Sequence, residues 1–227
     1  AGPDGAATRH LIDLNAALAR GEVGLIISGY AYPSPDGQSR AGQSGVHSDD
    51  MIPGLTKIAH AVHQAGGKIA MQIGHAGCNA FVVPEGGNAL GPSKMRMPQG
   101  CECREMTHRE IETTIQDFAH AAVRAKRSGF DGVQLHGAHG YLISQFLSPF
   151  YNKRTDDYGG SLENRARLVL SVLAAVRTAV GDAYPVMIKI NSDDFLEGGF
   201  HIEEMLQVAA MLESAGIDAV EISGGIG

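Results

Sequence analysis

The stretch GVQLHGAHGYLISQFL, residues 132–147, says most about how this chain folds and what it does. The apolar run at residues 130–135 is typical of a buried strand, and His136, His139 and Tyr141 follow directly. An α/β barrel gathers its functional side chains at the carboxyl ends of its strands. Two histidines and a tyrosine offer neutral hydrogen-bond donors and a weak acid. This combination suits the binding of a developing oxyanion and the delivery of a proton.

Four further apolar runs of strand length are spread along the chain. They are VGLIIS (23–28), KIAMQI (68–73), PVMIKI (185–190) and IDAVEIS (217–223). Continuous apolar runs are typical of parallel strands buried on both faces. Helical patterns separate the runs: one helix leads at residues 10–20, and Thr107 with Glu110 forms a capping box before a long helix ending near Gly129. Alternating strands and helices predict repeated βα units.

Long loops follow three of the predicted strands, at residues 29–52, 74–106 and 137–160. Long loops on the carboxyl side of parallel strands favour the functional mouth of a barrel. A complete eight-fold barrel needs roughly 250 residues, whereas this chain has 227 and stops just after a strand. We therefore predict an α/β fold: an incomplete barrel of about five to six βα units, in one domain over residues 1–227.

The composition places the chain among acidic proteins with a substantial apolar core. Apolar residues make up 44% of the chain, and 18 basic against 25 acidic residues give a net charge of −7. The absence of a basic patch argues against nucleic acid as a partner, and no apolar run is long enough for a membrane span. No signal peptide is visible, and three cysteines indicate no disulfide framework. Cys101 and Cys103 form a lone Cys-x-Cys, a weak metal signal. We predict a cytoplasmic enzyme.

The segment HGAHGYLISQFLSPFYNKRTDDYGGSLENRARL, residues 136–168, resembles the fourth βα unit of the old yellow enzyme family. Members of this family are NAD(P)H-dependent flavin oxidoreductases on a TIM (β/α)8 barrel. The resemblance continues, for the second, third, fifth and sixth strands, in VGLIISGY (23–30), GKIAMQIGHAG (67–77), PVMIKINSDDFLEGGF (185–200) and GIDAVEISGG (216–225). It covers essentially the whole chain and is closer to the enoate and 2,4-dienoyl-CoA reductase-like members than to the plant or yeast type.

The resemblance implies a reaction and three residues that carry it out. The reaction is reduction of the activated C=C bond of α,β-unsaturated carbonyl compounds, enones or enoates, with FMN and NAD(P)H as cofactors. Tyr141 matches the family's proton donor, and a phenol of pKa about 10 can protonate a developing enolate carbon. His136 and His139 match the pair that holds the carbonyl oxygen of the substrate. The oligomeric state stays open, a homo-oligomer included.

Three further residues match positions beside the flavin. Gln72 matches the residue that recognises the pyrimidine edge, where a carboxamide offers both donor and acceptor. Lys189 matches a cation near N1 and O2, where charge accumulates on reduction. Lys189 also lies inside an apolar strand, where burial is costly without a function. Tyr30 matches the loop after the second strand, beside the isoalloxazine. The resemblance implies no metal site.

The chain departs from the family pattern in two ways. The first, seventh and eighth strands are missing, and the last two carry the loops that hold the flavin phosphate. We therefore expect a chain with these ends to retain FMN weakly or not at all. In addition, Cys78 stands where many members have arginine.

From the residues alone, other classes remain open. A Schiff-base lyase or aldolase barrel would use Lys189 as its amine nucleophile. A metal-dependent hydrolase would use His75, His136 and His139 as ligands. A fragment without enzymatic activity is the third alternative.

Overall fold

The structure is a computed structural model that describes residues 1–83, 88–97 and 102–226. Its helices are α1 (Arg9–Arg20), α2 (Ile52–Gln64), α3 (His108–Arg127), α4 (Leu142–Leu147), α5 (Leu162–Val180) and α6 (Ile202–Ser214), with single 3-10 turns at η1 (Pro35–Gly37), η2 (Asp49–Met51) and η3 (Gly77–Asn79). Its strands are β1 (Leu25–Ile27), β2 (Lys68–Ile73), β3 (Ala89–Gly91), β4 (Met95–Arg96), β5 (Glu102–Glu105), β6 (Gly132–Gly137), β7 (Val186–Asn191) and β8 (Ala219–Ser223).

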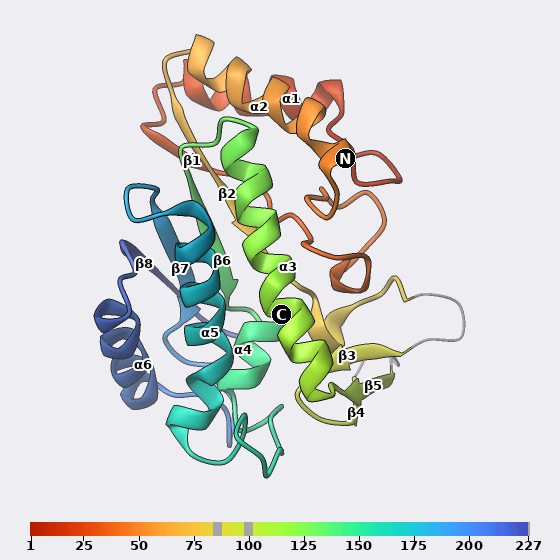
Figure 1. Ribbon diagram of the computed structural model, residues 1–227, viewed down its shortest axis with the longest axis vertical. Helices are drawn as coiled ribbons and strands as arrows, with labels where there is room; N and C mark the ends of the chain where they lie inside the picture. Colours follow the sequence, from red (N-terminus) through yellow and green to blue (C-terminus); the bar gives the residue numbers. More distant parts are fainter. Residues whose placement is uncertain (84–87, 98–101, 227) are drawn as a thin grey trace.

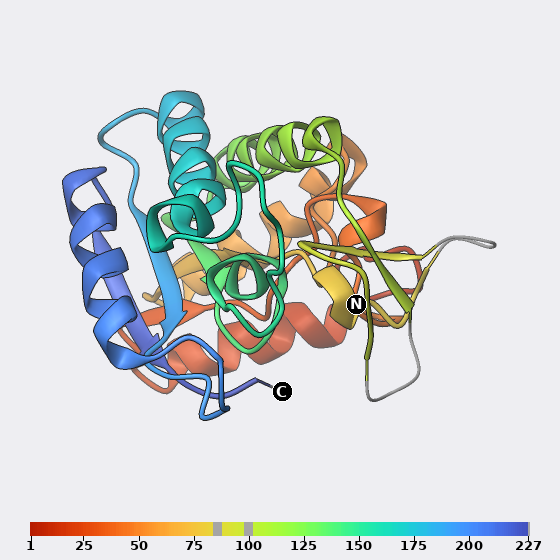
Figure 2. The same ribbon diagram turned by 90° about the horizontal axis from the view of Figure 1, so that it is seen from below.

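A curved parallel sheet in the order β1-β2-β6-β7-β8 forms the centre of the molecule. The strands follow one another in chain order, as expected when helical crossovers join neighbouring parallel strands. Helices α2, α3, α5 and α6 lie along one face of the sheet, and α3 packs beside α5 (Figures 1 and 2). The layer between helices and sheet is buried and apolar, and Phe118 and Val172 of the helices belong to the same buried cluster as Val133 and Ile188 of the strands.

The predicted elements are confirmed by the structure. Each of the five predicted strands begins and ends within two residues of an observed strand of the main sheet. The predicted capping box before α3 is present: Thr107 Oγ1 accepts from the Glu110 N–H at 3.3 Å, and the Glu110 carboxylate accepts from the Thr107 N–H at 2.8 Å. These short-range features depend on residues close in sequence, which explains why the sequence alone predicts them.

The sheet is open at both edges. Among the described residues, β1 and β8 each pair with a single neighbouring strand. Large apolar side chains on these edge strands are exposed, with Leu25 of β1 at 46% and Ile222 of β8 at 53%, and so is Leu206 of α6 at 62%. Closing a barrel removes sheet edges and buries such side chains. The structure therefore confirms the predicted incomplete α/β barrel. No helix in the described ranges combines the length and apolarity that a membrane crossing requires.

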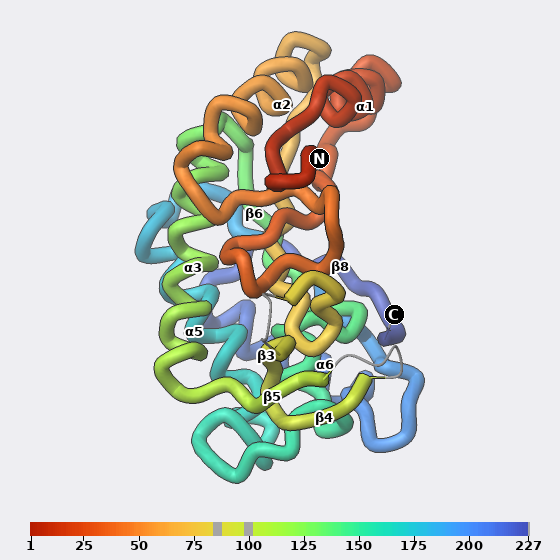
Figure 3. The backbone as a smooth tube through the Cα atoms, turned by 90° about the vertical axis from the view of Figure 1, so that its right-hand side faces the viewer, coloured from red at the N-terminus to blue at the C-terminus, as the bar shows by residue number. Residues whose placement is uncertain are grey.

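A small second sheet, which the sequence analysis did not predict, extends from the connection between β2 and α3. Its order is β3-β5-β4, and it lies on the side of the carboxyl ends of the main strands (Figures 1 and 3). A disulfide joins Cys78 of η3 to Cys103 of β5, with a Cα–Cα distance of 5.1 Å.

The disulfide corrects one expectation. The sequence predicts no disulfide framework, because three cysteines are a small and odd number. Cys78 and Cys103 nevertheless meet, because the second sheet folds back over η3 and brings β5 beside it. Cys101, the other half of the Cys-x-Cys, lies outside the described residues. The cytoplasmic location, which rested on the absence of disulfides, stays a prediction.

Candidate functional site

A single cavity at the carboxyl ends of the strands brings together all the site residues predicted from the sequence. Its volume is about 710 Å³. The six predicted residues on its wall are Tyr30, Gln72, His136, His139, Tyr141 and Lys189, and Ser39, Arg40, Asn79 and Phe81 line it as well. The predicted residues come from four different βα units. They converge because parallel strands end at the same edge of the sheet.

His136, at the end of β6, is held as a neutral hydrogen-bond donor. Burial, and then the nearby charges of His139 and Lys189, lower the pKa of His136 to about 3. Its Nδ1 accepts a hydrogen bond from the Ala138 N–H at 3.4 Å. In a neutral imidazole the proton then belongs on Nε2. His136 therefore offers one N–H group without a positive charge.

His139 is held in an unusual backbone conformation beside His136. Its φ of 60° lies in the left-handed region, which is costly for a residue with a side chain. The side chain of Asn191, at the end of β7, accepts a hydrogen bond from the His139 N–H at 3.1 Å. His139 Nε2 lies 2.6 Å from Ser223 Oγ, and its ring meets that of His136 edge to face at 5.2 Å. Burial, followed by the charge of Lys189, lowers the pKa of His139.

Tyr141 is the N-cap residue just before α4 and is paired with a second tyrosine. Its hydroxyl lies 2.8 Å from the hydroxyl of Tyr30, and its ring lies 4.9 Å from that of His136. Burial, and then the hydrogen bond with Tyr30, raise the pKa of Tyr141. The structure thus places Tyr30 against the predicted proton donor. A contact between Tyr30 and a flavin stays a prediction.

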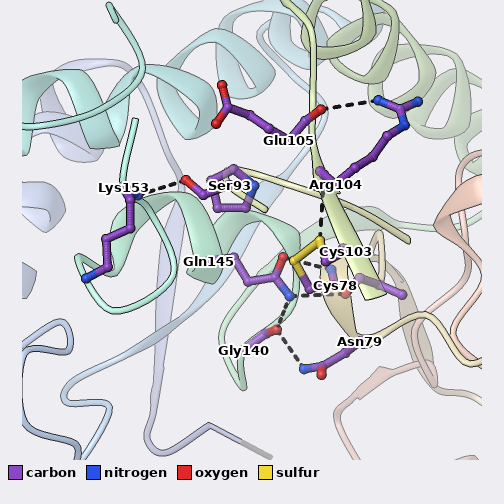
Figure 4. Close-up of a disulfide and its surroundings, with 12 residues drawn as sticks. Cys78, Asn79, Ser93, Cys103, Arg104, Glu105, Gly140, Gln145 and Lys153 are labelled. Atoms are coloured by element: carbon purple, nitrogen blue, oxygen red, sulfur yellow. Dashed lines mark hydrogen bonds between the residues drawn. A yellow bond between two sulfur atoms is a disulfide. The ribbon is translucent and has the colours of Figure 1, made fainter. Parts of the chain in front are cut away.

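A hydrogen-bond network holds the loop that carries Tyr141 (Figure 4). Gln145 Oε1 accepts from the Cys78 N–H at 3.0 Å, and Gln145 Nε2 donates to the Gly140 carbonyl at 2.6 Å. Asn79 Nδ2 donates to the same carbonyl at 2.8 Å. Gln145 and Asn79 were not predicted from the sequence, although a glutamine within the apolar segment LISQFL was a visible signal. The disulfide of Cys78 therefore anchors the second sheet directly to the Tyr141 loop.

A second polar network crosses the strands of the main sheet and reaches the cavity at Gln72 and Lys189. Gln72 Nε2 donates to Gln134 Oε1 at 2.7 Å, and Gln134 Nε2 donates to Glu221 Oε2 at 2.8 Å. Lys189 Nζ lies 2.8 Å from Glu221 Oε1. Burial would raise the pKa of Glu221, but the hydrogen bonds from Lys189 and Gln134 outweigh it and the net shift is downward. Gln134 and Glu221 were not predicted from the sequence, although they stand out, like Lys189, as polar residues inside apolar strands.

The donors and acceptors of this second network fit the pyrimidine edge of a flavin, which presents an N–H donor between two carbonyl acceptors. Gln72 Nε2 is engaged by Gln134, while Gln72 Oε1 accepts no hydrogen bond from the described part of the chain. That oxygen can accept from a ring N–H. Lys189, which also lines the cavity, adds a cation. Gln72 and Lys189 are therefore suited to holding an isoalloxazine ring.

The geometry gives no support to the two other enzyme classes. His75 is fully buried, its Nδ1 accepts from the Gly77 N–H at 3.0 Å, and its Nε2 faces Asp36 at 3.8 Å. Within residues 1–83, 88–97 and 102–226, no three His, Cys, Asp or Glu side chains are arranged to hold a metal ion. Lys189 is bound to Glu221, and that ion pair would have to break before the amine could attack a carbonyl.

Comparison with known proteins shows which family the chain belongs to. The sequence model of the NADH:flavin oxidoreductase / NADH oxidase family matches residues 1–225. The chain is 45% identical to an NADH oxidase of Thermoanaerobacter brockii, over 100% of this chain and 35% of that protein. It is 40% identical to an NADPH dehydrogenase of Halalkalibacterium halodurans, over 91% of this chain and 60% of that protein. The chain thus spans only part of the length of these relatives.

Solved structures resemble the whole described fold. A 2-naphthoyl-CoA reductase in complex with 2-naphthoyl-CoA superimposes with a TM-score of 0.93 at 37% identity, over 98% of this chain and 36% of that chain. An old yellow enzyme homologue from Zymomonas mobilis gives a TM-score of 0.89 at 30% identity, over 99% of this chain and 66% of that chain. The predicted cofactors, FMN and NAD(P)H, are those of flavin oxidoreductases of this kind. The chain belongs to the NADH:flavin oxidoreductase / NADH oxidase family, which includes the old yellow enzymes that its sequence resembles.

Proposed function

We propose that this chain forms the flavin-ring and substrate half of an FMN-dependent NAD(P)H oxidoreductase that reduces the activated C=C bond of α,β-unsaturated carbonyl compounds. Residues 1–227 act in this proposal as one partial flavin-binding barrel domain. One observation carries the proposal. A single cavity joins a neutral histidine pair and a tyrosine with a glutamine and a lysine suited to a flavin.

The two histidines bind the substrate oxygen. His136 donates its Nε2–H to the carbonyl oxygen, and His139 lies close enough to share that oxygen. A hydrogen bond to this oxygen becomes stronger as negative charge develops on it, so that the bond stabilises the transition state more than the bound substrate. Because His136 is neutral, it holds an enone without demanding an anionic ligand. The conjugated double bond is thereby polarised towards the oxygen.

Tyr141 supplies the proton. Its hydroxyl lies on the cavity wall beside His136, offset along the chain from the histidine pair. FMN, when bound, supplies the hydride to the β-carbon of the substrate. Gln72 and Lys189 orient the flavin ring, and Glu221 holds the Lys189 ammonium in place. Tyr141 then gives its proton to the α-carbon.

The test compares the two half-reactions of a Tyr141→Phe variant, made in a polypeptide that contains the complete barrel. The oxidative half-reaction with an enone should slow by roughly 10²–10⁴-fold, the usual value of a positioned general acid. Reduction of the flavin by NAD(P)H should be unchanged, because hydride transfer to the flavin takes no proton from Tyr141. Tyr158→Phe, outside the cavity, is the matched control. An unchanged oxidative rate in Tyr141→Phe would refute the role of Tyr141.

A further inference from the structure

Two tyrosines, Tyr30 and Tyr141, pair on the cavity wall, and the function proposed above gives this pairing no role. The hydroxyls of Tyr30 and Tyr141 lie 2.8 Å apart, although 111 residues separate them in the sequence. Their rings also pack against one another, with centroids 5.0 Å apart. In such a pair one hydroxyl donates to the other. When Tyr30 donates to Tyr141, the hydroxyl proton of Tyr141 is free to go to the substrate.

Arg40 adds a positive charge to this pair. It is exposed, lies in the loop between η1 and η2, and lines the cavity. Its guanidinium is close enough to both phenols, Tyr30 first, for them to raise the pKa of Arg40. The other nearby cation, Lys189, is bound to Glu221 at 2.8 Å, whereas Arg40 has no carboxylate partner in the described part of the chain. Among the described residues that line the cavity, Arg40 is therefore a cation without a carboxylate partner.

We propose that Tyr30 and Arg40 are positioning residues that act through Tyr141. Tyr30 replaces the proton that Tyr141 gives to the substrate, and Arg40 stabilises the phenolate that remains. The proposal rests on the function proposed above for Tyr141.

The transfer balances without any further reactant. The Tyr141 O–H bond breaks as a C–H bond forms at the substrate α-carbon, which leaves a phenolate at Tyr141. Tyr30 then gives its hydroxyl proton to that oxygen, so the negative charge moves to Tyr30. A proton from water restores Tyr30, which lies beside the exposed Arg40. The guanidinium is adjacent to the negative charge at both stages.

The other charged and titratable groups around Tyr141 do not replace Arg40. His136 is neutral, since its pKa is about 3, and burial lowers the pKa of His139 as well. Burial and the Tyr30 hydrogen bond raise the pKa of Tyr141, while Ser39 and the charge of Arg40 oppose that rise. Arg40 thus offsets part of the cost of forming a buried phenolate.

The first experiment measures the acidity of Tyr141 without turnover. Tyrosine Cζ carbons are labelled with ¹³C, the Tyr141 signal is assigned with Tyr141→Phe, and the protein with the complete barrel is titrated to alkaline pH. Arg40→Gln should lower the acidity constant of Tyr141 roughly tenfold, which is the effect of removing one nearby charge. Arg40→Lys should restore part of it. Arg20→Gln, an exposed change on α1, is the control. An unchanged Tyr141 titration in Arg40→Gln would overturn the proposal.

The second experiment follows the oxidative half-reaction against pH. Tyr30→Phe and Arg40→Gln should each slow it about tenfold and change its pH profile, while reduction of the flavin by NAD(P)H stays constant. Equal rates and profiles in wild type and Tyr30→Phe would overturn the relay. If Tyr141→Phe itself leaves the enone rate unchanged, the function proposed for Tyr141 fails. The titration would still show whether Arg40 sets the acidity of this phenol, so the two failures are distinguishable.

Discussion

We expect the free energy of unfolding to fall as pH drops from 7 to 5, and we expect His136 to account for a defined part of that fall. Burial, more than its charged neighbours, lowers the pKa of His136 in the folded protein to about 3. In the unfolded chain a histidine has a pKa of about 6.5. Between these values the unfolded chain binds a proton that the folded protein excludes. Stability is therefore complete above about pH 6.5 and is lost as pH falls below it.

The magnitude follows from the two pKa values. Well below pH 6.5, each pH unit removes about 1.4 kcal/mol of stability. Integrated from pH 7 to pH 5, the contribution of His136 is about 2 kcal/mol. His75 is also buried and its pKa is also lowered, so it adds a loss in the same direction. A comparison with a variant that lacks His136 alone separates the two histidines.

The assay is urea unfolding of wild type and His136→Gln at pH 5, 6, 7 and 8. Between pH 7 and pH 5, the unfolding free energy of wild type should fall by about 2 kcal/mol more than that of His136→Gln. His60→Gln, at an exposed position on α2, controls for the loss of one histidine. Histidine NMR reports the same quantity directly. A His136 ring that titrates near pH 6.5, or equal pH slopes for wild type and His136→Gln, would refute the reasoning.

Three further outcomes follow from the site. Glu221→Gln should leave Lys189 uncompensated and raise the two-electron potential of bound FMN by about 30 mV, equivalent to about 1.4 kcal/mol. A redox titration measures this potential, with Glu221→Asp as the control. An unchanged potential in Glu221→Gln would contradict the role given to the Lys189–Glu221 pair. The double variant Cys78→Ser, Cys103→Ser should lower the free energy of unfolding by about 3 kcal/mol, because the disulfide closes a loop of 25 residues. A reductant should lower the free energy of unfolding of wild type by a similar amount and leave that of the double variant unchanged. His139→Ala should weaken phenolic ligands about tenfold or more while flavin reduction by NAD(P)H persists; loss of flavin at unchanged ligand affinity would make His139 a cofactor residue instead.

The main sheet could be predicted because its signals are local. A run such as KIAMQI carries enough apolar surface to require burial on both faces, and β2 covers the same residues, Lys68–Ile73. The capping box at Thr107 depends on two residues three positions apart. The second sheet carries no comparable signal. Its strands are two to four residues long, and they are paired by the fold of the connection rather than by a pattern of their own.

The positions of the site residues were also accessible to sequence reasoning. Gln72, His136 and Lys189 lie on, and His139 and Tyr141 just after, strands that end at one edge of a parallel sheet, so the topology brings them to one cavity. Their identities resemble a family pattern, and the model of that family matches residues 1–225 as a whole. Their chemical roles stay proposals that the variants above test.

The sequence by itself determined which segments are strands and helices, which edge of the sheet carries the polar residues and which family the chain resembles. Strand period, capping and strand-end position could be predicted because they are properties of residues that are close in sequence. Only the tertiary structure decided that Tyr30 meets Tyr141, that Glu221 neutralises Lys189 and that a disulfide holds the second sheet to the cavity wall. Each of these contacts joins residues far apart in sequence. The distance, burial and charge balance that set their chemistry exist only after the chain has packed.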